Sequence, residues 1–261
     1  MNSRLSLLVA LAMSLCSHTA LAEMAPAPSG ATAPAVATSP APLPEGADDP
    51  LEPMNRKIFW FNDQLDIYVL APVATGWDFA VPKRAQTSVS NFFANLRFPI
   101  DTVNNLLQGK VNYAATDVGR FAVNTTVGVA GFFDPASDFG LAPHVEDFGQ
   151  TLGWWGFGPG PYLVLPILGP SSVRDGGGLI VDYPLSVTPF FIEWYYSLGA
   201  RTIEIVNYRA GILDQVKQVK EASLDYYTFV RSAYLQRRAS LVVDQAPMSE
   251  STATDLYHPE D

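Results

Sequence analysis

The sequence is short of the residues on which most metal centres and thiol chemistry depend. It has one cysteine and three histidines in 261 residues, and both Cys16 and His18 lie near the N-terminus. Disulfide frameworks, thiol catalysis and metal clusters need several such side chains at set spacings. The composition therefore argues against all three, and we expect no metal, no catalytic set and no cofactor.

Charge is also scarce, and positive charge is scarcest. Charged residues make up 16% of the chain, against about 25% in typical soluble domains. Lysine and arginine number 16 against 26 acidic residues, for a net charge of −10 at pH 7. Nucleic-acid binding needs clustered Lys and Arg, so we exclude nucleic acid as the main partner. With 48% hydrophobic residues, this shortage predicts a surface that something apolar covers.

The first residues have the pattern of an export signal. Arg4 precedes a mostly apolar run over residues 5–15, and Ala20-Leu21-Ala22 is a small-x-small cleavage site. We therefore expect a signal peptide over residues 1–22, cleaved after Ala22, and a mature chain that begins at Glu23. The mature protein then meets an oxidising compartment without disulfides.

Lipoprotein processing at Cys16 is the alternative to this cleavage. It would attach acyl chains to the thiol, but the residue before a lipidated cysteine is normally small and here it is Leu15. Cys16 otherwise only adds hydrophobicity to the signal segment. Both processing routes stay open, with cleavage after Ala22 favoured.

Composition divides the rest of the chain into a linker, a body and a tail. Residues 23–47 are rich in Ala, Pro, Ser and Thr and lack aromatic residues, which predicts a partly extended linker without a core. Residues 244–261 are polar and acidic without a basic residue, which predicts a disordered tail. Residues 48–243 remain, enough for one domain.

Helical periodicity and helix punctuation predict an all-α body. A helix is expected to end at Pro72, and another to begin at Pro99 and end at Gly109. The expected helices cover residues 54–70, 84–96, 99–109, 110–127, 188–210 and 223–241. Strand-like alternation is limited to Tyr162–Leu165, which prolines bracket, so we expect one small hairpin.

Long uncharged runs point to a membrane. Residues 148–173 carry no charge and could span a bilayer by length, but their glycines and prolines make an uninterrupted spanning helix unfavourable. The uncharged runs 121–133 and 183–192 are too short to span. Short apolar, aromatic-rich segments and scattered tryptophans are typical of the membrane interface. The alternative is that these runs form the core of a soluble helical protein.

Two stripes of polar residues interrupt the apolar helices. Asn55, Asn62 and Asp66 share a face of the first helix, although Ile58-Phe59-Trp60-Phe61 makes that helix apolar on more than one side. A second stripe on a later helix consists of Asp117, Arg120 and Asn124. A narrow polar stripe on a broadly apolar helix suits a polar channel inside an apolar wall, so we expect these six residues to line a channel. The alternative is a solvated face or a buried Asp/Arg pair.

Catalytic and ligand-binding motifs are weak. Ser171 and Ser172 do not lie in a G-x-S-x-G turn that would expose a nucleophile beside His144. The spacing of His144, Glu146 and Asp147 matches no zinc site. Gly156-Phe157-Gly158-Pro159-Gly160 lacks the lysine of a phosphate loop. Its glycines are better explained by a tight, movable turn.

Several sequence blocks in the body resemble the MlaA/VacJ lipoproteins. They occur in the right order between Asp48 and Arg238: Asp49-Pro50-Leu51-Glu52-Pro53-Met54-Asn55-Arg56, Asn104-Asn105-Leu106-Leu107-Gln108-Gly109, Arg120-Phe121-Ala122-Val123-Asn124-Thr125-Thr126-Val127-Gly128, Asp147-Phe148-Gly149-Gln150-Thr151-Leu152-Gly153, Gly160-Pro161-Tyr162, Leu168-Gly169-Pro170-Ser171 and Arg174-Asp175. Together these blocks are highly specific. The sequence departs from the family at the poor lipobox around Cys16 and in its long Ala/Pro linker.

The resemblance implies a ring of helices in the periplasmic leaflet of the bacterial outer membrane, with an amphipathic channel and a neighbouring trimeric porin. It further implies a non-enzymatic role, in which the protein removes phospholipids mislocalised in the outer leaflet and passes them to the soluble periplasmic carrier MlaC. Gly156 and Gly158 then correspond to a gate hairpin beside the channel. The alternatives are a soluble periplasmic lipid-binding module and, third, a lipid hydrolase that uses Ser171 or Ser172 with His144.

Overall fold

The computed structural model describes residues 49–186 and 194–244. The predicted signal peptide, Ala22, Cys16, the linker over residues 23–47 and the tail beyond Asp244 lie outside the described residues. The predicted helix 188–210 lies partly outside them.

The described chain is predominantly helical, as predicted. Its helices, in chain order, are α2 (Glu52–Leu65), a π-helical turn η3 (Asp66–Leu70), α3 (Ala71–Ala80), α4 (Lys83–Leu96), α5 (Phe98–Leu107), α6 (Val111–Thr126), α7 (Pro135–Asp138), α8 (Phe148–Trp154), α9 (Val173–Asp182), a 3₁₀ turn η4 (Tyr183–Leu185), α11 (Trp194–Gly211), α12 (Leu213–Ala222) and α13 (Tyr226–Val242). Strands β1 (Tyr162–Leu165) and β2 (Gly169–Ser172) lie between α8 and α9.

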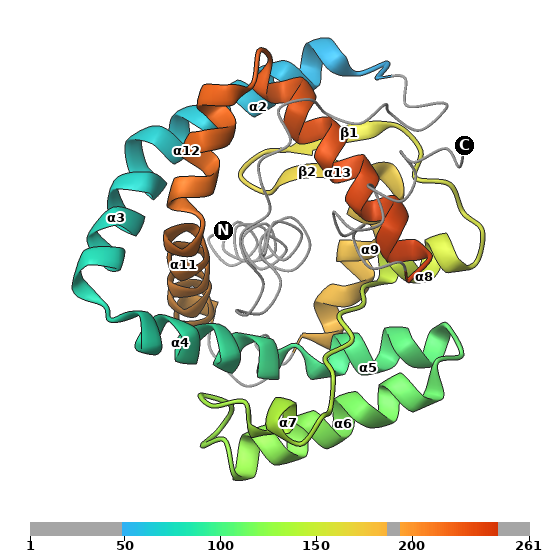
Figure 1. Ribbon diagram of the computed structural model, residues 1–261. Coiled ribbons are helices and arrows are strands. Elements are labelled where there is room, and N and C mark those ends of the chain that lie inside the picture. The colour runs from blue at the N-terminus through green and yellow to red at the C-terminus, as the bar shows by residue number, and fades with distance from the viewer. Residues whose placement is uncertain (1–48, 187–193, 245–261) are drawn as a thin grey trace, which may run out of the picture.

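The helices follow one another around a ring (Figure 1). Helices α2, α3, α4 and α5 form successive sides, with α11 packed against α3 and α4. The hairpin, α8, α9 and α13 complete the circuit, and α13 contacts both α8 and β2. Arg56 of α2 closes the ring by binding Asp225, the N-cap of α13, through its Nη1 and Nη2 atoms at 3.3 and 2.7 Å. Helices α6 and α7 form a lobe outside the ring, in which α6 packs on α5 and α7 packs on α6 (Figure 1).

The prediction that Pro72 ends the first helix is wrong, because the chain stays helical to Ala80. The π turn η3 intervenes, and its wider spacing lets the Ala71 amide donate to Asp66 O. Pro72 then falls in the first turn of α3, where a missing N–H costs least. The predicted helix 110–127 agrees closely with α6.

Helices α3, α8, α9 and α12 were not predicted. The sequence signals for α8 and α9 were their caps, since Asp147 accepts a hydrogen bond from Gln150 N and Ser172 accepts one from Asp175 N. Three glycines in α9 and two in α8 obscured these signals, because glycine weakens a helical pattern.

The predicted hairpin is confirmed. Strands β1 and β2 are antiparallel, with Tyr162 opposite Ser172 and Leu165 opposite Gly169. Gly156 and Gly158, however, precede the hairpin and lie in the loop between α8 and β1. Their assignment to a hairpin turn is therefore corrected, because the turn between β1 and β2 contains Ile167, with a φ of 69°, and is followed by Gly169, with a φ of 84°, at the start of β2.

The interior is mainly polar. Among the described residues, 13 buried residues are apolar, while 25 are polar or charged. The apolar cluster consists of Tyr162, Val164, Tyr227 and Tyr234, against which Ile58, Phe59 and Leu235 pack. No described helix combines the length and the apolarity needed to cross a bilayer.

Candidate functional site

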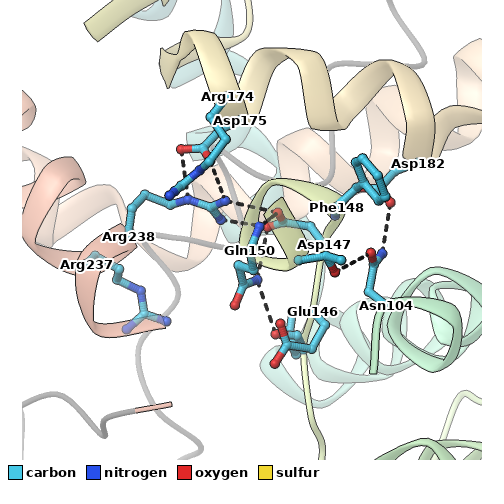
Figure 2. Close-up of polar contacts among 12 residues, drawn as sticks. Asn104, Glu146, Asp147, Phe148, Gln150, Arg174, Asp175, Asp182, Arg237 and Arg238 are labelled. Atoms are coloured by element: carbon cyan, nitrogen blue, oxygen red, sulfur yellow. Dashed lines mark hydrogen bonds and ion pairs between the residues drawn. The ribbon is translucent and has the colours of Figure 1, made fainter. Parts of the chain in front are cut away.

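A buried arginine joins three helices at the centre of the polar interior. Arg238 of α13 donates to Asp147 at 2.6 and 3.0 Å and to Asp175 at 3.1 and 2.9 Å, and only 3% of the residue is exposed. Figure 2 shows its guanidinium between the two carboxylates, while the neighbouring Arg237 points away from them. Arg238 thereby ties α13 to the N-cap of α8 and to the first turn of α9.

The same network reaches α5 through side-chain amides. Asn104 is fully buried, and its Nδ2 donates to Asp182 of α9 at 2.9 Å (Figure 2). Its Oδ1 accepts from Thr151 Oγ1 at 2.8 Å. Gln108 then binds both Thr151 and Glu146. Neutral amides therefore connect the charged groups across three helices.

Burial and neighbouring charge shift several carboxyl pKa values in opposite directions. Burial raises the pKa of Asp147, but the charge and hydrogen bonds of Arg238 outweigh it, so this pKa lies well below its usual range. Burial, with the nearby Asp147 charge, raises the pKa of Asp182 to about 6. Burial, with the charge of Asp101, raises the pKa of Asp117 to about 7. The interior thus holds carboxyl groups that titrate near neutrality.

Stability should fall as pH rises through the range in which Asp117 titrates. A carboxyl with a raised pKa binds more protons in the folded state, so its contribution is complete below about pH 4 and is lost toward pH 7. We expect Asp117→Asn to show less loss of unfolding free energy than wild type between about pH 6 and pH 8. Denaturant titrations of both proteins at a series of pH values measure the difference.

His144 also contributes to the pH dependence of the unfolding free energy. Burial lowers its pKa, so its contribution is lost as pH falls, opposite to that of Asp117. Because both proteins retain His144, whose Nδ1 lies 3.6 Å from Asp117 Oδ1, the difference between their curves reports Asp117 together with its interaction with His144. Parallel curves would show that Asp117 is ionised throughout this range.

The first predicted polar stripe holds the hairpin. Asn55 is fully buried; its Nδ2 donates to Tyr162 O at 2.9 Å, and its Oδ1 accepts from Val164 N at 2.9 Å. Asn62, two turns further along α2, repeats the pattern with Leu165 O and Ile167 N at 2.9 and 2.7 Å. The two amides therefore fasten the backbone of β1 and its turn to α2.

Asn55→Ala should cost about 2–6 kcal/mol of unfolding free energy. It leaves the buried Val164 N–H and Tyr162 carbonyl without their side-chain partner, at about 1–3 kcal/mol for each unsatisfied group. Asn112→Ala is the matched control, because Asn112 is exposed on α6 and should change stability by no more than about 0.5 kcal/mol. If denaturant unfolding gave the same loss of stability for Asn55→Ala and Asn112→Ala, Asn55 would not be what fastens the hairpin to α2.

Asp66 completes this stripe at the junction with α11. Its carboxylate receives Arg209 Nε at 2.7 Å and Arg209 Nη2 at 3.0 Å, with Lys220 Nζ of α12 at 3.5 Å. It therefore joins three helical segments of the ring wall.

The second stripe faces the outer lobe. Arg120 donates to both oxygens of Asp134 at 3.1 and 2.9 Å, and Asn124 Nδ2 donates to the same carboxylate at 2.8 Å. Asp117 accepts from Asn105 Nδ2 at 2.8 Å. These contacts brace α6 against α5 and α7. Channel lining by either stripe stays a prediction.

The two predicted gate glycines differ in their backbone. Gly156 has a φ of +91°, which favours glycine, and its amide donates to Gly153 O at 2.9 Å. Gly158 has no positive φ in this region, and a Cβ there would meet nothing within 4 Å. The whole stretch Trp154–Gly160 is exposed. Phe157 N→Leu152 O at 3.0 Å and Arg174 N→Pro159 O at 3.1 Å hold it on either side of Gly158.

The serines considered for a hydrolase are occupied in backbone bonding. Ser172 Oγ caps α9 by accepting from Asp175 N at 3.1 Å, and Ser171 Oγ donates to Ser172 O at 3.3 Å. His144 instead stacks on Tyr113 at 3.9 Å between ring centroids. Within residues 49–186 and 194–244, no group of three or more His, Cys, Asp or Glu is arranged to hold a metal ion.

Large apolar side chains are exposed at several places along the ring. They include Trp60, Tyr68 and Phe79 on the α2–α3 side, Phe133 after α6, and Trp154 and Trp155 at the end of α8. Phe79 is 94% exposed. Together with the polar interior, these residues reverse the usual distribution of a soluble protein.

The central residues of the network were not predicted as a site. Arg238, Asn104 and Asp182 come from three helices distant in sequence, and Asp147 was considered only as a metal ligand. The available signals were the cap pattern before Gln150 and the family blocks that begin at Asn104 and Asp147. The pairing with Arg238 depends on how α13 returns to α8.

Known proteins match this chain over most of its length. The family model described as MlaA lipoprotein matches residues 47–241. The intermembrane phospholipid transport system lipoprotein MlaA of Escherichia coli (strain K12) is 40% identical over 204 residues, which cover 74% of this chain and 78% of that protein. The Haemophilus influenzae protein of the same name is 34% identical over 195 residues, covering 72% and 77% of the two chains.

A further relative and a solved structure are also similar to this chain over most of its length. An uncharacterized protein of Rickettsia bellii is 37% identical over 195 residues, covering 74% of this chain and 76% of its own length. A structure reported as the structural basis for maintenance of bacterial outer membrane lipid asymmetry superposes with a TM-score of 0.67 at 37% identity, covering 75% of this chain and 99% of that chain. The family model and the relatives together establish that this chain belongs to the MlaA lipoprotein family.

Proposed function

We propose that this protein is an outer-membrane component of an intermembrane phospholipid transport system and maintains the lipid asymmetry of that membrane. The observation that carries the proposal is the reversed distribution of side chains, with 25 polar against 13 apolar buried residues among those described and bulky apolar groups outside. Lipid tails can cover such exposed apolar groups, while the buried polar groups bond one another and hold the helices of the ring together. The family names of its relatives support the same assignment.

In this proposal the ring lies in the periplasmic leaflet of the outer membrane and encloses an amphipathic channel. A phospholipid from the outer leaflet moves its head group along polar side chains while its tails remain in an apolar phase, which avoids burying an unpaired polar group at several kcal/mol. The two polar stripes enter this proposal as residues that shape the wall around the channel: Asn55, Asn62, Asp66, Asp117, Arg120 and Asn124. Their hydrogen bonds run to the hairpin, to α11 and α12, to α5 and to the outer lobe.

The proposed route continues to a soluble periplasmic carrier of the MlaC type, and a trimeric porin is the proposed neighbour in the membrane. Transport through this component is passive, because the sequence offers no nucleotide-binding loop. The exposed loop around Gly156 and Gly158 is the proposed gate.

Deletion of the gene tests this function. We expect phospholipid to accumulate in the outer leaflet and resistance to detergent with EDTA to fall, and the full-length chain should restore both. Normal outer-leaflet composition in the deletion strain would overturn the role in lipid asymmetry.

Membrane fractionation tests the location, since a soluble lipid-binding module would remain in the periplasmic fraction without detergent. Release of fatty acid from a labelled phospholipid would instead favour a hydrolase.

A further inference from the structure

The outward face of α2 carries a shallow depression of about 440 Å³, lined by Arg56, Lys57, Trp60 and Phe61. These residues form two i, i+4 pairs, so they share one face of the helix. The opposite side of α2 is occupied, because Asn55 and Asn62 bind the hairpin, and Phe59 packs against Tyr226 and Tyr227. The depression therefore belongs to the exterior of the ring.

The depression has two cationic side chains, and they differ in whether an acidic side chain of the described residues pairs with them. Arg56 is bound by Glu52 at 2.7 Å and by Asp225 at 2.7 Å, and its guanidinium lies 4.4 Å from the centre of the Tyr227 ring. Lys57 is exposed, and it forms no ion pair with an acidic residue among residues 49–186 and 194–244. On a chain with a net charge of −10, such a lysine leaves a local positive charge for an external anion.

An apolar surface begins beside this charge. Trp60 is 64% exposed and Phe61 is 48% exposed. Tyr68, one heptad beyond Phe61, is 75% exposed, and Val69 follows it. An amphipathic aromatic next to lysine matches the boundary between lipid head groups and acyl chains.

We propose that this face of α2 is a binding site for a membrane glycerophospholipid, whose phosphate pairs with Lys57 and whose acyl chain lies against Trp60 and Phe61. The occupant is a lipid rather than free phosphate, because one lysine without converging backbone donors binds a free anion weakly in water, whereas the aromatic pair adds apolar area. The site rests on the proposed function and adds to it a docking position outside the ring.

Photocrosslinking of the full-length protein in phosphatidylethanolamine/phosphatidylglycerol vesicles tests the site. The vesicles contain a small fraction of a phospholipid with a diazirine in its acyl chain, and mass spectrometry locates the modified residues. We expect modification in the peptide that contains Trp60 and Phe61. Lys57→Glu should lower its yield by about fivefold or more, because it removes one lysine contact at an anionic surface and adds a repelling carboxylate. Lys57→Arg should retain the yield.

Lys217→Glu is the matched control, because Lys217 is an exposed lysine on α12. It makes the same charge change away from the depression and should leave the yield unchanged. Trp60→Ala with Phe61→Ala should weaken vesicle binding while preserving the thermal unfolding midpoint. A parallel sample with excess inorganic phosphate should crosslink to the same extent. A lower yield in phosphate would show that the site binds a free anion and would overturn the proposal of a lipid occupant.

The outcomes separate this site from the general function. Equal crosslinking of the Lys57→Glu and Lys217→Glu variants would overturn the α2 site, as would absence of modification at α2 in the wild type. The proposed transport role would still stand if the same wild-type chain restored outer-leaflet asymmetry in the deletion strain. Failure of that restoration, with crosslinking at α2 intact, would overturn the transport role and leave a lipid-binding surface.

Discussion

Arg238→Met should destabilise the protein by about 3–5 kcal/mol, the cost of removing one partner from a buried ion pair. Methionine keeps most of the aliphatic length but removes the hydrogen bonds to Asp147 and Asp175. Asp175 retains Arg174, whose Nε lies 2.8 Å away. Asp147 retains hydrogen bonds from Gln150, but this buried carboxylate loses its bidentate cation.

Arg237→Met is the control for the charge and length of the side chain. It changes the adjacent arginine on the same helix, which points away from the carboxylates (Figure 2). In denaturant unfolding at neutral pH, the unfolding free energy of Arg238→Met should be far lower than that of Arg237→Met. The deficit of Arg238→Met should also shrink in mild acid, because protonation can then neutralise Asp147. Similar stability of the two variants would show that the network is not what holds α13.

Gly158→Pro should leave the protein in the membrane at normal abundance and raise outer-leaflet phospholipid to the level of the deletion strain. Gly158 lies in an exposed loop between two backbone hydrogen bonds, and a Cβ added there meets no neighbour within 4 Å. Proline fixes φ and restricts the preceding residue, so it stiffens the loop. The measurements are immunoblots of membrane fractions and labelling of outer-leaflet phospholipid.

Two variants separate a moving gate from a static turn. Gly158→Ala restricts the backbone much less and should keep normal lipid asymmetry. Gly156→Pro should lose abundance and function together, because proline cannot adopt the φ of +91° and removes the hydrogen bond to Gly153 O. Normal function with normal abundance in Gly158→Pro would refute the gate. Reduced abundance of Gly158→Pro would instead mark a structural turn.

The helical class and the family were predictable because they depend on local and linear signals. The apolar stripe of α6 and its end at Thr126 appear in a short stretch of sequence, as does the alternation of Tyr162–Leu165. The apolar cover that scarce charge and abundant apolar residues indicate stays a prediction. The blocks from Asp49 to Asp175 established the family resemblance by their order along the chain.

Partners distant in sequence required the tertiary structure. The stripe of Asn55 and Asn62 was recognised as polar, but only the approach of β1 to α2 assigns both amides to backbone groups more than 100 residues away. Arg238 carries no local sign of two buried acidic partners, because they become neighbours when α13 returns to α8 and α9. The predicted helix end at Pro72 was wrong for a related reason, since the π turn η3 places this proline in the first turn of α3 and the chain stays helical. Sequence by itself therefore determined composition, helical periodicity and family, whereas the tertiary structure decided which buried polar groups satisfy one another, because those pairings depend on where the chain closes its ring.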